Sequence, residues 1–407
     1  MTNCDFLVIG GGVIGLSIAR ELKARHKDTR ILIIEKEASC GFHASGRNSG
    51  VLHAGFYYSP DSLKAKFTKL GNERMTAYCE RKGLSLNRCG KLVVAKDAND
   101  LPALDELIRR GQANGIEIQE VSEAEAKRIE PRAKTYQRAL FSPRTSTVNP
   151  QQVVDAMLQE AKSDGIEIRF STAYMRRENC GILTNVGPIT AGYVVNAAGL
   201  YADKIALDYG FSKKYRILPF KGLYLYSSEP PGAIRTNIYP VPDLRNPFLG
   251  VHFTITADGR AKIGPTAIPA FWRENYEGFQ NFSLGELMEV AARGLGLLAN
   301  AQFDYRRLAV EEVAKYSRSK MVALASTLAE GVVESNYQHW GRPGIRAQLL
   351  DITKKKLEMD FVLEGDRGSI HVLNAVSPAF TCSLPFADYV CDRIEHSRMQ
   401  TGTPLAV

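Results

Sequence analysis

Residues 5–15 read DFLVIGGGVIG, and this stretch decides the fold of the amino-terminal part of the chain. Asp5–Ile9 is a short apolar segment typical of a buried β-strand, and it runs directly into the glycine-rich turn Gly10–Gly15. Leu16–Arg25 is predicted to be a helix, and Ile31–Ile34 a second strand that ends at Glu35. A strand, a G-x-G-x-x-G turn, a helix, a second strand and an acid form the βαβ unit that binds dinucleotides.

Each part of this unit has a physical role in holding a dinucleotide. Gly10 allows the tight turn, Gly12 lets the pyrophosphate approach the backbone, and Gly15 lets the helix pack closely on the strand. The helix N-terminus directs unpaired N–H groups and the positive end of its dipole at the phosphates. Glu35 is placed to accept hydrogen bonds from the ribose hydroxyls and would repel a 2′-phosphate, which argues against NADP.

Bulk properties indicate an ordinary globular protein. The chain has 407 residues, 44% of them hydrophobic and 24% charged, and a formal net charge of +8. This length suits two domains or one elaborate domain. No apolar run approaches the length of about 18 residues that crosses a bilayer. With the first strand starting at Asp5, the sequence predicts no targeting peptide and a cytoplasmic location. The seven scattered cysteines indicate reduced thiols, with neither a disulfide framework nor a metal site.

The pattern of elements predicts an α/β (α+β overall) fold with a discontinuous nucleotide-binding domain. Helices are predicted at residues 62–82, 101–113, 151–164, 283–299, 315–328 and 383–396. Strands are predicted at residues 89–95, 116–121, 166–170, 193–199, 345–350, 361–363 and 370–373, and residues 216–273 are strand-rich and aromatic. Ser122 is predicted to cap a short helix with Glu125 at its third position. The tail, residues 397–407, is predicted to be flexible.

Several longer blocks carry a resemblance to a known family. They read GRNSGVLHAGFYY at residues 46–58, CGKLVVA at 89–95, NIYPVPD at 237–243, PFLGVHFT at 247–254 and GIRAQ at 344–348. The chain resembles the FAD oxidoreductases of the D-amino-acid-oxidase class, and within them the L-2-hydroxyglutarate dehydrogenase/oxidase family. Near the C-terminus, Val376 stands where that family usually has proline and Phe380 where it has a small residue, so the pocket is expected to differ in shape there.

The resemblance implies a Rossmann-like FAD-binding domain of glutathione-reductase type with an inserted β-rich substrate domain. The FAD-binding domain is expected to comprise residues 1–85, 145–215 and 335–396, and the substrate domain residues 86–144 and 216–334. The implied reaction is oxidation of L-2-hydroxyglutarate to 2-oxoglutarate, with hydride transfer to flavin N5. Electrons would then pass to oxygen or to a membrane quinone.

This chemistry needs a proton acceptor and cations for the carboxylates. His53 is the first candidate for the base, because an imidazole can accept the hydroxyl proton near neutral pH; the alternative is a hydrogen bond that shapes its loop. His252 is the second candidate, with a structural strand histidine as its alternative. Arg346 offers a two-donor fork for a carboxylate or the flavin edge, against a structural salt bridge. Through the resemblance, Lys64 becomes a carboxylate contact, although a helical lysine is usually solvated.

Aromatic side chains complete the predicted substrate site. Tyr57, Tyr58 and Tyr239 could donate hydroxyls to the substrate, although aromatic residues at strand spacing more often lie in the core. The full set of predicted substrate contacts is Tyr57, Lys64, Tyr239, His252 and Arg346.

The predicted cofactor contacts share glycine-rich or polar loops that supply backbone N–H groups, or lie at the tips of strands and the start of the last helix. They are Gly10, Gly12, Val13, Ile14, Gly15, Glu35, Lys36, Ser45, Gly46, Asn48, Ser49, Gly50, Ala198, Gly199, Gly344, Ser377, Pro378, Ala379 and Thr381. The dipole of the last helix is expected to stabilise negative charge on the reduced flavin. No motif predicts a covalent flavin linkage.

Two other readings compete. An FAD amine oxidase acting on a D-amino acid or an N-methyl amino acid would share the glycine fingerprint, but the blocks in residues 239–254 resemble the hydroxyglutarate family. A flavin-carrying nucleic-acid-binding protein would need an arginine-rich extension, which the sequence lacks. The positive net charge is compatible with an anionic substrate, with peripheral contact at the inner face of the cell membrane, or with a plain solubility surplus. The oligomeric state leaves no mark on the sequence.

Overall fold

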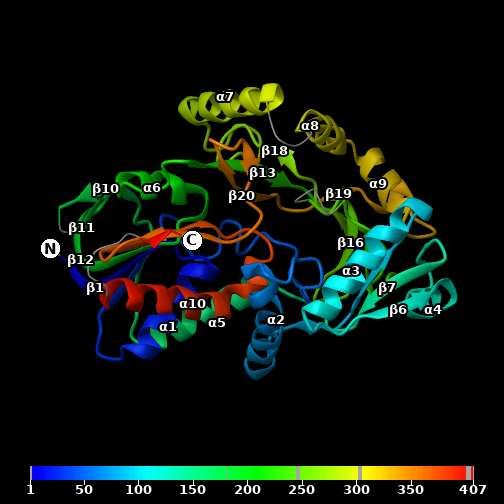
Figure 1. The fold of residues 1–407 in the computed structure, drawn as a ribbon, viewed down its shortest axis with the longest axis horizontal. Coiled ribbons are helices and arrows are strands. Elements are labelled where there is room, and N and C mark those ends of the chain that lie inside the picture. The colour runs from blue at the N-terminus through cyan, green and yellow to red at the C-terminus, as the bar shows by residue number, and fades with distance from the viewer. Residues whose placement is uncertain (1, 180, 244–247, 301–304, 400–404, 407) are drawn as a thin grey trace. The chain divides into compact units, whose positions relative to one another are not determined.

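The computed structural model describes residues 2–179, 181–243, 248–300, 305–399 and 405–406, and it divides into two compact units (Figure 1). Unit 1 comprises residues 1–48, 150–219 and 346–407, and unit 2 comprises residues 49–149 and 220–345. Residues 49–85 therefore belong to unit 2, whereas the sequence analysis placed them with the FAD-binding segments. Two residues used in the sequence analysis lie outside the described residues: Pro247, which begins the block at 247–254, and Cys180, one of the seven cysteines.

Unit 1 is built on a sheet of nine strands in the order β24-β22-β23-β12-β1-β2-β9, with β10 and β11 attached through β12. The neighbours β23, β12, β1, β2 and β9 run parallel. Its elements are β1 (Thr2–Ile9), α1 (Val13–Arg25), β2 (Ile31–Ile34), α5 (Pro150–Ser163), β9 (Glu167–Arg169), β10 (Tyr174–Glu178), β11 (Gly181–Thr184), β12 (Gly187–Asn196), α6 (Ala202–Asp208), β21 (Lys356–Leu357), β22 (Val362–Gly365), β23 (Ser369–Asn374), α10 (Ala379–Met399) and β24 (Leu405–Ala406).

The central strands of this sheet are apolar because both of their faces are covered. All four residues of β2 are buried, as expected for a strand inside a parallel sheet with helices on its faces. Leu16, Ile18 and Leu22 of α1 are fully buried as well. Helix α1 begins at Val13, three residues earlier than predicted, so its first turn follows the glycine turn directly.

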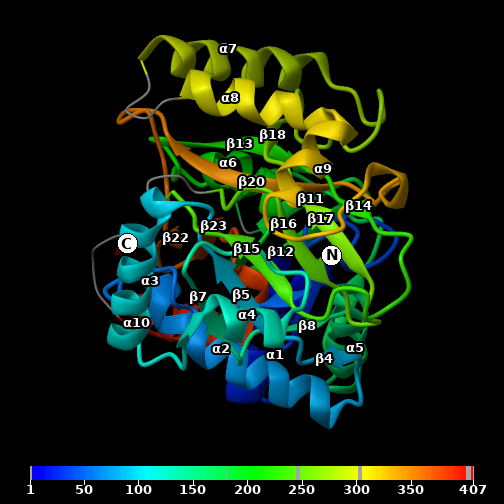
Figure 2. The same ribbon diagram turned by 90° about the vertical axis from the view of Figure 1, so that its right-hand side faces the viewer.

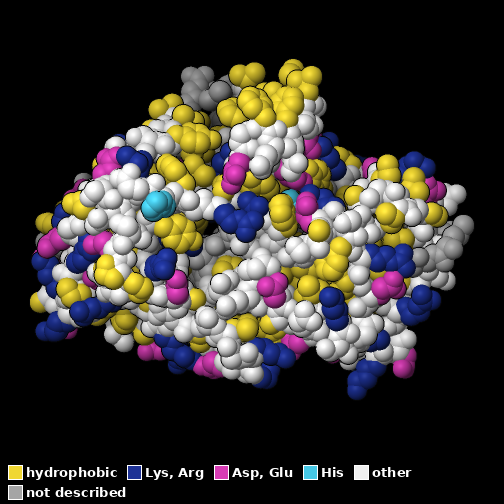
Figure 3. All heavy atoms as spheres, turned by 180° about the vertical axis from the view of Figure 1, so that it is seen from behind, with side chains coloured by type: hydrophobic (Ala, Val, Ile, Leu, Met, Phe, Trp, Pro, Cys, Tyr) yellow, Lys and Arg dark blue, Asp and Glu magenta, His cyan; other side chains and the backbone are white. Residues whose placement is uncertain are grey.

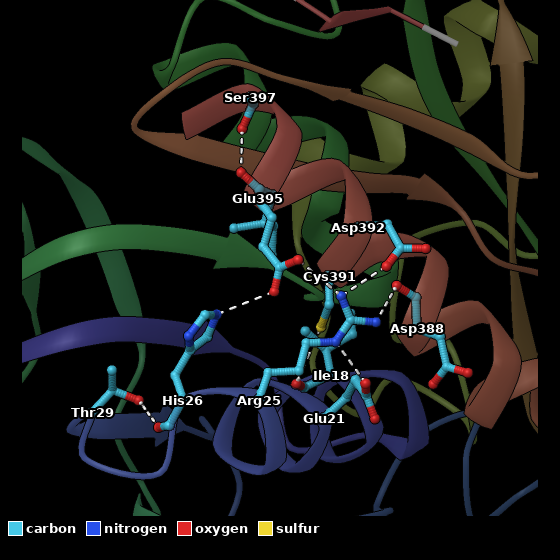
Figure 4. A network of polar contacts seen from close by, with 11 residues as sticks. Ile18, Glu21, Arg25, His26, Thr29, Asp388, Cys391, Asp392, Glu395 and Ser397 are labelled. Carbon is cyan, nitrogen blue, oxygen red and sulfur yellow. Dashed lines mark hydrogen bonds and ion pairs between the residues drawn. The ribbon is translucent and has the colours of Figure 1, made fainter. Parts of the chain in front are cut away.

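Helix α1 is tied to α10 by a polar network (Figure 4). Arg25 donates to Asp392 Oδ1 at 2.7 Å and to the Asp388 carbonyl at 3.2 Å, and it also pairs with Glu21 on its own helix at 2.7 Å. The Cys391 thiol lies 3.9 Å from the Ile18 carbonyl. Each of these ion pairs is partly exposed and therefore worth little alone, but together they fix the orientation of the helix that begins at the glycine turn.

Unit 2 contains a sheet of eight strands in the order β19-β14-β17-β16-β15-β5-β7-β6 and a three-stranded sheet, β3-β8-β4. Its helices include α7 and α8, which run alongside each other (Figure 2). The elements are β3 (Val51–Leu52), α2 (Leu63–Arg81), β4 (Leu86–Asn87), β5 (Lys91–Val94), α3 (Leu101–Ala113), β6 (Gln119–Ser122), α4 (Glu123–Ile129), β7 (Arg138–Ser142), β8 (Ser146–Val148), β14 (Leu225–Tyr226), β15 (Asn237–Pro240), β16 (His252–Ile255), β17 (Ala261–Gly264), β18 (Ile268–Pro269), α7 (Leu284–Asn300), α8 (Tyr305–Val313), α9 (Arg318–Ser326) and β19 (His339–Trp340).

The chain passes between the units four times, after residues 48, 149, 219 and 345. The last two passages fall within strands, β13 (Tyr215–Gly222) and β20 (Gly344–Asp351). Short 3₁₀ turns at Ala98–Asp100, Gly199–Tyr201, Ala314–Tyr316 and Glu334–Asn336 complete the described elements. The capping box predicted at Ser122 is confirmed, because its hydroxyl accepts from the Glu125 N–H and the Glu125 carboxylate accepts from the Ser122 N–H.

Several sequence predictions are wrong in detail. The strand expected at residues 116–121 is β6, at Gln119–Ser122, because the Ile116 N–H donates to the Gly111 carbonyl and closes the end of α3. Helix α8 was not predicted. The last helix, α10, begins at Ala379 and continues to Met399, and Leu405–Ala406 pairs with β22. The prediction of a flexible tail is therefore wrong for residues 397–399 and 405–406; residues 400–404 and 407 lie outside the described part of the chain.

Candidate active site

The glycine turn of unit 1 is packed so closely that side chains would not fit. A Cβ on Gly15 would lie 2.0 Å from the Gly10 carbonyl oxygen. A Cβ on Gly10, whose φ is +111°, would lie 2.6 Å from the Ala197 carbonyl oxygen and 3.3 Å from the Ala198 Cα. The turn therefore rests against the end of β12, where the sequence predicted Ala198 as a packing contact. Gly199 begins the following 3₁₀ turn.

The start of α1 is open to an anion. Gly12 is its N-cap and offers no side-chain cap, while the Val13 N–H donates to Ser45 Oγ at 2.9 Å. A Cβ on Gly12 would lie 2.9 Å from the same Ser45 oxygen. The loop that carries Ser45 thus lies against the helix N-terminus, the place where backbone N–H groups and the helix dipole favour phosphate.

The carboxylate of Glu35 is held in place by the backbone. Its Oε2 accepts from the Gly11 N–H at 2.8 Å and its Oε1 from the Glu37 N–H at 2.9 Å. A carboxylate has about four acceptor positions, so capacity for ribose hydroxyls remains. Lys36, another predicted cofactor contact, forms an ion pair with Glu37. This pair indicates that Lys36 has a structural role in the loop in addition to its predicted contact.

The loop after Glu35 has its own internal order. A Cβ on Gly46 would lie 2.2 Å from the Gly41 carbonyl oxygen, and Gln151 donates to the Cys40 carbonyl at 3.3 Å. Asn48 donates to the Ser45 carbonyl at 2.8 Å. Gln151 was not predicted as part of this loop, since the contact joins residues more than 100 positions apart.

These residues fit a bound dinucleotide. A helix N-terminus with a glycine N-cap, glycines at positions that a Cβ would block and a fixed acid at the end of the second strand are the features that hold the adenosine and pyrophosphate of FAD. Within unit 1, the structure brings together Gly10, Gly12, Val13, Gly15, Glu35, Ser45, Ala198 and their neighbours.

Other predicted cofactor contacts lie elsewhere in the chain. Ser49 and Gly50 fall just across the boundary, in unit 2, where Gly50 accepts from the Val148 N–H at 2.9 Å. Gly344 is also in unit 2. Because α10 begins at Ala379, Thr381 lies in its first turn and is fully buried, rather than preceding the helix as predicted.

Three of the predicted substrate residues of unit 2 lie on or against one buried face of the eight-stranded sheet. The Tyr239 ring of β15 stacks on the His252 ring of β16, with centroids 3.6 Å apart. His252 Nδ1 lies 2.9 Å from the Gly250 carbonyl oxygen, a contact in which Nδ1 carries the proton. Tyr57 is buried beside this group. The structure thus brings together Tyr57, Tyr239 and His252.

His53, Lys64 and Arg346 are placed individually. His53 follows β3 and is buried. Lys64 is buried on the first turn of α2, with its Nζ 5.9 Å from the centre of the Tyr58 ring. A lysine on a helix usually points into solvent, but the side chain of Lys64 is buried. Arg346 lies on β20 in unit 1 and is half-buried.

Sequence reasoning missed Lys91. Its side chain is fully buried on β5, within a strand whose other residues are apolar. A lysine at such a position is costly to bury, and that cost was the available signal.

The comparisons with known proteins agree with this geometry. The family model for "FAD dependent oxidoreductase" matches residues 5–393. The mitochondrial L-2-hydroxyglutarate dehydrogenase of Bos taurus is 36% identical over 97% of this chain and 89% of its own length. The L-2-hydroxyglutarate dehydrogenase of Escherichia coli K12 is 32% identical over 96% of this chain and 93% of its own length.

Solved structures show the same fold. L-α-glycerophosphate oxidase from Mycoplasma pneumoniae, with FAD bound, superposes with a TM-score of 0.76 at 21% identity and covers 97% of this chain and 95% of its own. Glycine oxidase from Geobacillus kaustophilus gives a TM-score of 0.72 at 22% identity, covering 98% and 96%.

The fold and the glycine turn thus define an enzyme of the FAD-dependent oxidoreductase class, with FAD as its cofactor. The chain belongs to the FAD dependent oxidoreductase family and, within it, to the family of the L-2-hydroxyglutarate dehydrogenases. The sequence-based assignment to this family is confirmed.

Proposed function

We propose that this protein oxidises L-2-hydroxyglutarate to 2-oxoglutarate with bound FAD. The observation that carries the proposal is the similarity to L-2-hydroxyglutarate dehydrogenases along nearly the entire chain, at 36% identity for the bovine enzyme and 32% for that of Escherichia coli. The fold alone is shared with glycine oxidase, so it does not discriminate between hydroxy acids and amines. The relatives with the higher identity are all hydroxy-acid enzymes, which favours the hydroxy acid.

When bound, FAD supplies the two-electron acceptor, and the protein supplies binding, orientation and proton transfer. The hydroxyl proton needs an acceptor, for which His53 and His252 are the candidates. His252 donates from Nδ1 to the Gly250 carbonyl, and this contact orients its ring. Arg346 and Lys64 are proposed to neutralise the substrate carboxylates.

Product analysis tests this proposal. The holoenzyme and an artificial electron acceptor should convert L-2-hydroxyglutarate to one equivalent of 2-oxoglutarate for every two electrons transferred, and should leave the D-enantiomer unchanged. Ammonia released from a D-amino acid, or an amine released from an N-methyl amino acid, would instead assign the chain to the amine-oxidising branch.

Arg346→Ala is expected to weaken substrate binding with a smaller effect on the maximal rate. Loss of a guanidinium–carboxylate pair costs about 1.5–3 kcal/mol, which corresponds to a rise in KM of roughly 10- to 100-fold. Steady-state kinetics with L-2-hydroxyglutarate measures this change, and Arg346→Lys should recover only part of the loss because it lacks the two-donor fork. Unchanged KM in Arg346→Ala would return this residue to a structural role.

For the electron acceptor, we propose a membrane quinone, reached by peripheral contact at the inner face of the cell membrane. Among the described residues, none of the helices combines the length and hydropathy needed to cross a membrane. Instead, α7 exposes Leu284, Met288 and Leu295, with exposed fractions of 64%, 63% and 67%, and the preceding loop exposes Phe279 at 84%. Figure 3 shows hydrophobic side chains gathered at the end of the surface where α7 lies. Such exposure supports membrane contact.

Replacing Leu284, Met288 and Leu295 together by glutamine should reduce binding to vesicles of anionic phospholipid by at least about 10-fold, because each side chain contributes on the order of 1 kcal/mol or more on burial. Co-sedimentation measures the binding. Met175→Gln with Val186→Gln is the matched control, since these side chains of unit 1 are 58% and 64% exposed. Equal loss in both variants, or no binding by the wild type, would favour oxygen as the acceptor.

A further inference from the structure

The eight-stranded sheet of unit 2 carries an apolar cluster on each of its two faces. One face is the apolar core, to which neighbouring strands contribute Leu92, Ile238, Phe253 and Ile263. Because side chains alternate along a strand, the residues between these positions point to the other face. That second face carries Lys91, which is paired in register with Asn237 of β15. That face is also covered by apolar residues, among them Val93 and Leu140, so a buried lysine is unusual there.

Lys91 is enclosed by aromatic rings. Its Nζ lies 4.2 Å from the centre of the Tyr239 ring, 5.0 Å from that of Tyr57 and 5.6 Å from that of Phe56. The face of an aromatic ring attracts a cation, and each such contact is worth about 0.5–2 kcal/mol. In water, an ammonium donates hydrogen bonds to water oxygens. The ring faces are weaker acceptors than these oxygens, and they carry no negative charge to balance the ammonium.

Within the described part of the chain, Lys91 Nζ is buried and has no hydrogen-bond partner, and the hydroxyl of Tyr57, whose ring centre lies 5.0 Å from this Nζ, is in the same state. Burial lowers the pKa of Lys91 to about 7, with only a minor opposing effect from Cys89. Burial also holds the pKa values of Tyr57 and Tyr239 well above their usual range, so both phenols remain protonated donors. An ammonium and a phenol, both donors, thus share one buried space with no described acceptor.

A group that satisfies both donors must be an acceptor, and one that compensates the charge must be an anion. A buried polar group without a partner costs about 1–3 kcal/mol, and a charged group costs more. Unpartnered buried donors are therefore expected where a bound ligand supplies the missing acceptor. A carboxylate has two oxygens and fits an ammonium and a phenol at once.

We propose that Lys91 and Tyr57 form a carboxylate-binding site that receives one carboxylate of the substrate. This inference rests on the proposed function for the identity of the substrate, but the site itself is defined by its chemistry, an organic carboxylate. Lys91 Nζ and the Tyr57 hydroxyl donate to the carboxylate, and the rings of Tyr239 and Phe56 exclude water around it.

Ligand binding to the oxidised holoenzyme tests the site without turnover. The dissociation constants of 2-oxoglutarate and of glutarate are measured by isothermal titration calorimetry. Lys91→Met should raise them by roughly 10- to 100-fold, and Tyr57→Phe by roughly 3- to 10-fold, as expected for a charged and a neutral hydrogen bond. Tyr337→Phe is the matched control, since Tyr337 is another fully buried tyrosine of unit 2 but belongs to the apolar core on the opposite face. It should leave both constants unchanged.

The pH dependence of binding gives a second readout that a merely structural lysine would not produce. A bound carboxylate favours the charged form of Lys91 and so raises its pKa above the value of about 7 in the free enzyme. Below pH 7 the amine is already charged, and affinity is constant with respect to this group. Above pH 7, binding takes up a proton and affinity falls as pH rises. Burial raises the pKa values of the neighbouring Tyr57, Tyr239 and Cys89. Burial lowers the pKa of Lys262, on β17 of the same face, to about 8, and His252 stacks on Tyr239, so proton uptake that persists in Lys91→Met belongs to these groups and is subtracted from that of the wild type.

Calorimetry in two buffers of different ionisation enthalpy should therefore show proton uptake near pH 8 in the wild type and in Tyr57→Phe, and none from this group in Lys91→Met. A loss of affinity in Lys91→Met for 2-oxoglutarate but not for 2-oxopentanoate would assign the site to the distal carboxylate. A loss for both ligands would assign it to the carboxylate beside the keto group. Either result supports the site.

The proposal fails if Lys91→Met and Tyr57→Phe bind glutarate and 2-oxoglutarate like the wild type. Should Lys91→Met not fold, Tyr57→Phe and the proton uptake of the wild type decide the question. Failure of the proposed function is a separate outcome: a wild-type enzyme that does not oxidise L-2-hydroxyglutarate but binds glutarate in a Lys91-dependent way keeps the site and changes the substrate.

Discussion

Gly15→Ala is expected to yield a protein that retains less than about a tenth of the wild-type FAD content. The added Cβ would lie 2.0 Å from the Gly10 carbonyl oxygen, and because this oxygen belongs to the backbone it cannot rotate away, so α1 must move away from β1. That movement displaces the helix N-terminus from the phosphates. The FAD content is measured from the ratio of absorbance at 450 and 280 nm and from FAD released by heat.

Gly285→Ala is the matched control for this steric argument. It lies in α7, where a Cβ would meet no atom within 4 Å, so the variant should bind FAD fully. Far-UV circular dichroism separates loss of the cofactor from loss of the fold. A Gly15→Ala protein with wild-type FAD content would show that the glycine turn does not hold the cofactor in the way described.

His53→Ala is expected to leave FAD bound and to slow reduction of the flavin by L-2-hydroxyglutarate by on the order of 10²-fold or more. Removal of a general base typically costs 10²- to 10⁴-fold, because the hydroxyl proton then lacks a positioned acceptor. Anaerobic stopped-flow absorbance at 450 nm, at saturating substrate, measures the rate of this step directly and separates it from reoxidation.

The same experiment on His252→Ala decides between the two histidines. His252 stacks on Tyr239 and its ring is oriented by the contact with the Gly250 carbonyl, which suits either a base or a group that positions the substrate. Under the assignment to His53, His252→Ala should lose less in the rate of reduction than His53→Ala. A wild-type rate in His53→Ala, with a large loss in His252→Ala, would transfer the role to His252.

The local parts of the fold could be predicted from the sequence because each rests on neighbouring residues. The turn at Gly10–Gly15, the strand Ile31–Ile34 and the capping box at Ser122 each depend on spacing within a few positions. The family could be predicted as well, because long blocks of side chains match. Whether the predicted domain boundaries correspond to a cofactor domain and a substrate domain stays a prediction.

The parts that could not be predicted depend on contacts between distant segments. Lys91 looks like any lysine at the start of an apolar strand until Tyr57 and Tyr239 are folded around it. The tail looks polar and unpatterned, but Leu405–Ala406 finds a partner in the edge strand β22. In both cases the deciding partner lies far away in the chain, where local periodicity carries no information.

The most direct test of the central claim is anaerobic bleaching of the flavin band near 450 nm by a panel of small substrates. The panel contains L- and D-2-hydroxyglutarate, L-lactate, L-malate, sarcosine and D-alanine. We expect rapid bleaching by L-2-hydroxyglutarate alone, with 2-oxoglutarate as the product. Bleaching by sarcosine or D-alanine, with none by L-2-hydroxyglutarate, would contradict the account and place the enzyme among the amine oxidases.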